Sequence, residues 1–125
     1  MYMLLAIALG GALGALGRYF ITGYIQNLTG NQFPWGTLSV NILGCALLGV
    51  LLAVISKTWS PSAEIRSFFI VGLMGALTTF SAFSFEVVLM VEKGQWLTAI
   101  SYIVLSVLCC VGATMGAMLA TRAVI

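Results

Sequence analysis

Four apolar stretches dominate this chain of 125 residues and leave little room for any other architecture. They cover approximately residues 3–24, 37–56, 67–91 and 96–121. Each holds the roughly 20 residues that a helix needs to cross about 30 Å of hydrocarbon. Only helices and closed barrels satisfy their backbone polar groups inside lipid. We therefore expect an all-α membrane protein with four transmembrane helices, forming one domain over residues 1–125.

The composition favours the same class. Hydrophobic residues make up 62% of the chain and charged residues only 6%, against roughly 25% charged residues in soluble domains. Trp35, Trp59 and Trp96 lie at the expected helix ends, where their rings prefer the headgroup zone. The N-terminus lacks a basic flank and a small-residue cleavage site, so we expect the first stretch to be a retained helix and not a signal peptide.

Several classes of function find no residues to support them. The chain has no histidine, no metal-ligand spacing, no phosphate-binding loop and no nucleophile paired with a general base. Its three cysteines, Cys45, Cys109 and Cys110, lie within apolar stretches and are typical of buried free thiols. We expect neither an enzyme nor a nucleic-acid-binding protein.

The few charges are almost balanced between the two sides of the membrane. Lys57, Arg66 and Arg122 lie on one side, whereas Lys93 lies on the other and Arg18 falls in the last two turns of the first helix. Loop lysines and arginines set the orientation of a membrane chain, so a bias this weak would allow insertion in either direction. An antiparallel homodimer is therefore compatible with the sequence but not required by it.

Glycines recur at intervals of four in the first and fourth stretches, as Gly10 with Gly14 and as Gly112 with Gly116. This spacing lets two helix backbones approach closely in lipid. The pattern does not decide between packing within one subunit and packing between subunits.

The third stretch contains an unusually polar segment, GLMGALTTFSAFSFE, over residues 72–86. Two glycines precede Thr78 and Thr79, which favours a break in the helix near residues 75–79. Backbone left unpaired at membrane depth must line a cavity, be buried in protein or bind an ion. Free carbonyls there could coordinate a monovalent cation, and the next half-helix would add the positive end of its dipole.

Two aromatic rings follow this predicted break. On a helix, Phe80 and Phe83 project within about 60° of each other, with Ser84 beside them and Thr79 and Glu86 on the adjoining flank. Packing is the ordinary role of phenylalanines at this spacing. The alternative is that their electropositive edges, next to hydroxyl donors, stabilise a partly dehydrated anion.

Polar groups in the other stretches suit the second interpretation. Asn41 lies within the second stretch with Thr37 one turn before it, either as interhelical glue or as a donor at a pore mouth. Charges such as Glu86 and Arg18 are costly at membrane depth and are usually functional or paired. The fourth stretch carries polar side chains at intervals of four, namely Tyr102, Ser106, Cys110 and Thr114.

Three motifs of this sequence together resemble the fluoride channels of the Fluc (CrcB) family. They are GxxGxLTTFSxFSxE at residues 72–86, GTLxVNxxG at residues 36–44 and GGxxGAxxR at residues 10–18. The Thr-Thr-Phe-Ser-x-Phe-Ser core is specific, and the resemblance runs over nearly the whole chain. The residues alone lead to an anion pathway and a permitted antiparallel dimer; fluoride comes from the resemblance.

The resemblance implies an antiparallel homodimer in the lipid bilayer, with two fluoride pores and one structural sodium ion at its centre. Gly75 and Thr78 match the positions whose backbone carbonyls hold the sodium. Phe80 and Phe83 match the pore phenylalanines, with one ring from each subunit in a given pore. Asn41 matches the asparagine that meets the ion in the vestibule.

Beyond the rings, Glu86, Tyr102 and Ser106 match a polar track. Cys110 falls where a hydroxyl residue would extend that track, and a thiol is a weaker donor. The implied function is passive export of cytoplasmic fluoride by a multi-pass protein of the inner or plasma membrane. The residues implied in the fluoride pathway are Asn41, Thr79, Phe80, Phe83, Ser84, Glu86, Tyr102, Ser106 and Cys110.

Two other functions compete with the channel. A small four-helix exporter of drugs or cations would also have dual topology and a similar length. Such transporters exchange protons through an acid in the first helix, where this chain has only Arg18, while Glu86 lies late in the third. A non-conducting subunit of a membrane assembly would not need the Thr/Phe/Ser constellation.

Overall fold

The computed structural model describes all 125 residues of the chain and contains only helices and connecting loops. Four helical segments are long and apolar enough to cross a membrane. This confirms the expected all-α membrane protein with four spanning segments. The elements are α1 (Tyr2–Thr29), α2 (Trp35–Lys57), α3 (Ala63–Ser67), the π-helix η1 (Phe68–Met74), α4 (Gly75–Leu77), α5 (Phe80–Glu92) and α6 (Trp96–Val124).

The first helix is longer than its apolar stretch, because it ends at Thr29 instead of near residue 24. The side chain of Gln26 is satisfied there: its amide donates to the Phe33 carbonyl at 3.0 Å and its oxygen accepts from the Gly36 amide at 3.0 Å. These bonds hold the following loop against the last turn of α1. Gly30 then ends the helix with a φ of 82°, a left-handed conformation that favours glycine.

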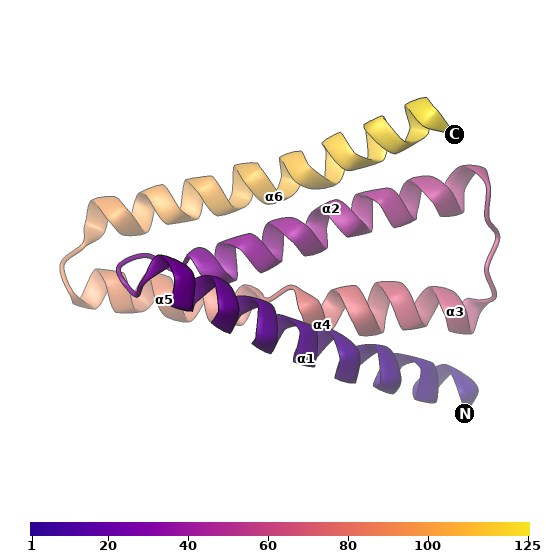
Figure 1. Cartoon of the computed structure of the whole chain (residues 1–125), viewed down its shortest axis with the longest axis horizontal. Helices are drawn as coiled ribbons and strands as arrows, with labels where there is room; N and C mark the ends of the chain where they lie inside the picture. The colour runs from indigo at the N-terminus through magenta and orange to yellow at the C-terminus, as the bar shows by residue number, and fades with distance from the viewer.

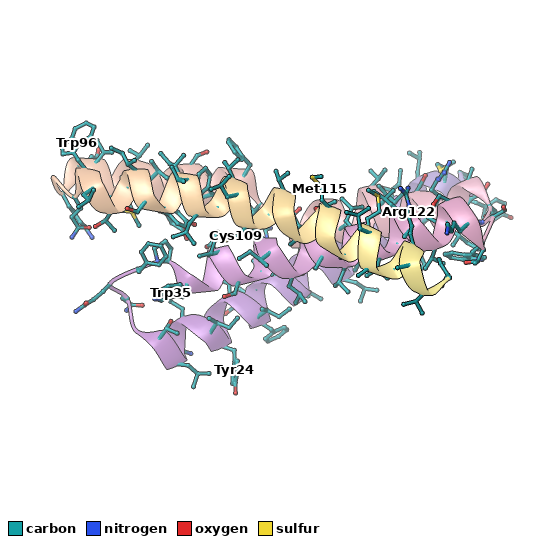
Figure 2. All side chains as sticks on the ribbon, turned by 90° about the horizontal axis from the view of Figure 1, so that it is seen from above. Tyr24, Trp35, Trp96, Cys109, Met115 and Arg122 are labelled. Atoms are coloured by element: carbon teal, nitrogen blue, oxygen red, sulfur yellow. The ribbon has the colours of Figure 1, made fainter.

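The four spanning segments lie lengthwise beside one another, with α1, α2 and α6 as single helices and α3 to α5 together as the third (Figure 1). The chain termini and the loop between α2 and α3 lie at one end of the molecule, and the other two loops lie at the opposite end (Figure 1). Trp35 and Trp96 lie toward that opposite end, whereas Arg122 lies near the C-terminus (Figure 2). This is the arrangement that tryptophan belts at the membrane surface require.

The outer faces of the helices are apolar. Only 18 of 125 residues are buried, and large side chains such as Leu9 (62% exposed) and Leu108 (67% exposed) point outward. A water-soluble chain could not leave so much apolar surface uncovered. Lipid is the solvent that suits this surface. Inside, one small cluster joins Leu38, Phe83, Met90, Ala99 and Tyr102, and a second joins Val40, Met74 and Leu77.

The glycines of the first helix pack against the third spanning segment of the same subunit. A Cβ atom on Gly10 would collide with the carbonyl oxygen of Phe68, and one on Gly14 would collide with that of Leu73. Gly112 and Gly116 differ, because no atom of the subunit lies within 4 Å of a Cβ placed there. The structure therefore assigns the first glycine pair to packing within the subunit and leaves the second on an open face.

Candidate functional site

The site begins where helical backbone gives way to extended backbone in the third spanning segment. α4 ends at Leu77, and Thr78 (φ −86°, ψ 149°) and Thr79 (φ −145°, ψ 118°) are extended before α5 begins at Phe80. The hydroxyl of Thr79 caps the new helix by accepting from the Ala82 amide at 3.1 Å. The positive end of the α5 dipole therefore lies beside these two threonines.

Asn41 of α2 holds this extended segment from the side. Its Oδ1 accepts from the Thr79 amide at 2.8 Å, and its Nδ2 donates to the Thr79 carbonyl at 3.0 Å. In a continuous helix, the Thr79 amide would have donated to the carbonyl of Gly75. An asparagine amide nitrogen carries two protons, so one N–H of Asn41 remains for another acceptor.

The carbonyl oxygen of Thr78 also lacks the partner that a helix would give it. No backbone or side-chain hydrogen bond of the subunit ends on this oxygen, although Thr78 itself donates its amide and its hydroxyl to Met74. A free carbonyl at membrane depth needs water, an ion or another chain. The atoms that could bind an ion here are carbonyl oxygens, and oxygen ligands suit a hard cation.

A cavity of about 270 Å³ lies against the extended segment, between α2, α5 and α6. Asn41, which has the free N–H, and Ser106 of α6 both line this cavity. The Ser106 hydroxyl is buried and has no hydrogen-bond partner. Of the candidate residues from the sequence, the cavity brings together Asn41, Thr78, Thr79, Phe80, Phe83, Ser106 and Cys110.

The two phenylalanine rings differ in their surroundings. Phe83 is only 8% exposed, whereas Phe80 is 76% exposed, and their ring centroids are 5.2 Å apart with planes tilted by 50°. Phe83 also packs against Tyr102, at a centroid distance of 5.1 Å. One ring thus belongs to the interior of the subunit, and the other projects from it.

Glu86 is held by two hydroxyl donors. Thr37 of α2 donates to Oε1 at 2.5 Å, and Tyr102 of α6 donates to Oε2 at 2.6 Å. A carboxylate is stabilised by such donors when it is removed from water. Sequence reasoning did not include Thr37 among the site residues, although its position one turn before Asn41 was a usable signal.

Five of the candidate residues do not line the cavity against the extended segment, which we call the central cavity: Arg18, Gly75, Ser84, Glu86 and Tyr102. Ser84 donates its hydroxyl to the Phe80 carbonyl at 2.9 Å, within its own helix. Glu86 lines a separate cavity of about 220 Å³ near the loop between α1 and α2. Arg18 lines a third cavity, of about 500 Å³, whose wall includes Thr37 and Thr79. Thr79 is thus shared between the central cavity and that of Arg18.

Comparison with known proteins agrees with this architecture. The family model described as "CrcB-like protein, Camphor Resistance (CrcB)" matches residues 5–118. This chain belongs to the CrcB family. A relative from Hahella chejuensis, named "Fluoride-specific ion channel FluC", is 43% identical over 122 residues, covering 98% of this chain and 96% of its own. A relative of the same name from Sulfurovum sp. is 44% identical, covering 97% of this chain and 95% of its own.

A third relative with this name, from Desulforapulum autotrophicum, is 47% identical over 94 residues and covers 75% of each chain. The first two relatives span nearly the full length of this CrcB-family chain, and the family model covers residues 5–118, so all three motifs fall within the matched region. The relatives are named as ion channels, and membership of this family confirms the expectation that the chain is not an enzyme.

Proposed function

We propose that this chain is a fluoride-specific ion channel that lets cytoplasmic fluoride leave the cell passively. The observation that carries the proposal is the pair of bonds between Asn41 and Thr79, which fixes an amide donor in the wall of the cavity. The names of its relatives support fluoride as the ion. The spanning segments agree with a multi-pass membrane protein, and we place it in the inner or plasma membrane.

Fluoride is small and strongly hydrated, so a selective path must replace its lost water with donors that are already in position. The free N–H of Asn41 and the unpartnered hydroxyl of Ser106 supply two such donors in one cavity. The edges of the Phe80 and Phe83 rings are weakly positive and supply the next contacts. The anion would pass from the amide to the ring edges and then along the hydroxyls.

The exposure of Phe80 supports an antiparallel dimer. Phe80 lines the proposed ion cavity, yet its ring is 76% exposed in the single subunit. One side of the pathway is therefore open in one subunit alone. In the proposed dimer, Phe80 of one subunit and Phe83 of the other complete each pore, so that one dimer contains two pores. The near-balanced charges of the chain permit the opposite insertions that such a dimer needs.

In this proposal, the third spanning segment is a broken helix whose break binds a structural sodium ion on the dimer axis. The Thr78 carbonyl, which has no partner within the subunit, and the Gly75 carbonyl, whose helical partner is diverted to Asn41, would hold it. Sodium supplies positive charge that satisfies these oxygens at membrane depth. The same carbonyls from the second subunit would complete its coordination.

The outer part of the pathway consists of Glu86, Tyr102, Ser106 and Cys110, as the family resemblance implies. The driving force is the inside-negative membrane potential, which is worth about 2.3 kcal/mol per charge per 100 mV. Fluoride that enters as neutral hydrofluoric acid and ionises in the cytoplasm would therefore leave without an energy source. No observation favours the cation exporter, since Glu86 is already engaged by two hydroxyls.

Fluoride efflux from liposomes tests this function. Phe80→Ile and Phe83→Ile keep volume and apolar character but remove the ring edge, so we expect folded dimers with strongly reduced efflux. Phe80→Met and Phe83→Met should conduct in part, because the thioether is polarizable. Phe85→Ile is the matched control, because this ring is 64% exposed and lies outside the cavity wall. Isoleucine variants that conduct like the parent would show that the rings only pack.

A further inference from the structure

Two cysteines from different helices meet in the wall of the central cavity. Cys45 lies on α2 and Cys110 on α6, and both line the cavity. The hydroxyl of Thr114 lies 3.1 Å from the carbonyl oxygen of Cys45 and 3.2 Å from that of Cys110, so one atom bridges the two backbones. The helices are therefore closely apposed at the level of these two thiols.

The two thiols are not oxidised. Cys45 and Cys110 line the same cavity on these apposed helices, and all three cysteines of the chain are free. No three His, Cys, Asp or Glu side chains lie together in a way that could hold a metal ion. A tetrahedral zinc site, which takes four ligands, has no basis here. Two thiolates are enough only for a soft metal ion that accepts two ligands in a line.

We propose that Cys45 and Cys110 form a binding site for a soft, thiophilic metal ion, with Hg²⁺ as the best match. Mercuric chloride would react with the two thiols to give a neutral dithiolate complex, releasing two protons and two chloride ions. No electrons are transferred, and the metal keeps its oxidation state. The complex carries no net charge, which favours Hg²⁺ over a monovalent metal in a site of low dielectric constant.

Mercury at this site would lie next to the donors that the proposed anion pathway uses. Asn41 is one helical turn before Cys45 on α2, and Ser106 is one turn before Cys110 on α6. A bound metal would occupy the cavity wall beside both donors and would tie α2 to α6. We therefore expect mercury to block fluoride efflux. This consequence rests on the proposed function, whereas the binding site itself does not.

Metal binding is tested first, without any flux measurement. The full chain carrying Cys109→Ser retains only the proposed pair, because Cys109 (labelled in Figure 2) does not line the cavity. We expect it to bind one Hg²⁺ per subunit, seen as thiolate-to-mercury charge-transfer absorption, with both remaining thiols protected from N-ethylmaleimide. Adding Cys45→Ser or Cys110→Ser should weaken retention against excess glutathione by roughly 10²–10⁴-fold, the usual gain from a second tethered ligand.

Efflux from liposomes tests the functional consequence, with each variant compared with its own metal-free rate. HgCl₂ should block the parent and Cys109→Ser but not the variants lacking Cys45 or Cys110. Two results would overturn the proposed metal site. One is the loss of tight Hg²⁺ binding in Cys109→Ser, and the other is tight Hg²⁺ binding that persists in both the variant lacking Cys45 and the variant lacking Cys110. Tight binding without a block would overturn only the inhibition. A parent that carries no fluoride even without metal would refute the proposed function, while the binding data would still decide the metal site.

Discussion

Replacing Asn41 is the most informative single change, because its two hydrogen bonds to Thr79 and its free donor can be separated. Asn41→Leu removes both hydrogen bonds and the free N–H donor while keeping a similar side-chain volume. Asn41→Asp keeps an acceptor for the Thr79 amide but has no proton for the Thr79 carbonyl and none for an anion. The two variants should therefore differ in stability and agree in function.

The magnitude follows from the two bonds of 2.8 and 3.0 Å. Hydrogen bonds between membrane helices contribute about 0.6 kcal/mol on average and up to about 1.7 kcal/mol. Losing both in Asn41→Leu should therefore destabilise the fold by roughly 1–3 kcal/mol. Asn41→Asp keeps the bond to the Thr79 amide, but its second oxygen faces the Thr79 carbonyl and its charge lies at membrane depth, so we expect a larger loss than in Asn41→Leu.

The measurement has two parts. Unfolding of the purified protein in detergent or bicelles gives the difference in stability, and liposome efflux of correctly assembled protein gives the function. We expect both variants to carry little fluoride, with Asn41→Asp the less stable. Equal stability of Asn41→Leu and the parent would show that the Asn41–Thr79 bonds do not hold the segment. Normal efflux through Asn41→Asp would refute the role of the free N–H.

Four further outcomes follow from the structure. Gly14→Ala should destabilise the subunit by about 1–3 kcal/mol through overpacking, whereas Gly112→Ala should change little, and equal effects in an unfolding assay would contradict the assigned packing. Tags at the C-terminus should be reached from both sides of the membrane; labelling from one side alone would exclude the antiparallel dimer. Exchange of sodium for N-methyl-D-glucamine should lower the melting temperature of the dimer, and an unchanged value would remove the sodium site. Ser106→Ala should reduce efflux about fivefold, the equivalent of one hydrogen bond of ~1 kcal/mol. Tyr102→Phe should mainly reduce stability, by roughly 1.5–3 kcal/mol. A loss of efflux in Tyr102→Phe with normal efflux in Ser106→Ala would show that Tyr102 is the donor on the path.

The fold class could be predicted from the sequence because the bilayer imposes a length on each spanning helix. Twenty apolar residues between polar connectors have few other solutions in lipid. The residue at which α1 ends could not be predicted from hydropathy, because it depends on contacts of Gln26 with Phe33 and Gly36 across a loop. Hydropathy records where a chain leaves hydrocarbon, and it does not record where a helix stops.

The members of the central cavity could be predicted in large part, but their partners could not. Periodicity placed Asn41, Phe83 and Ser106 on candidate faces, because a helix repeats every 3.6 residues. The alternatives for Asn41 were glue and pore-mouth donor, and the structure shows bonds to the backbone of Thr79, which is 38 residues away in the chain. No local pattern specifies which backbone group a side chain will meet at that separation.

Glu86 illustrates the same limit and changes how the polar track is understood. A carboxylate at membrane depth needs a partner, and Arg18 was the only cation within a spanning stretch that the sequence offered. The structure gives it the hydroxyls of Thr37 and Tyr102 instead.

Each of these two hydroxyls has one proton, and that proton is already directed at Glu86. Tyr102 can therefore donate to an anion only by giving up its bond to the carboxylate. Ser106 has a buried hydroxyl with no partner, and it can donate at no such cost. The first hydroxyl that fluoride meets beside the rings should thus be Ser106, with Glu86, Thr37 and Tyr102 holding α2, α5 and α6 in register around it.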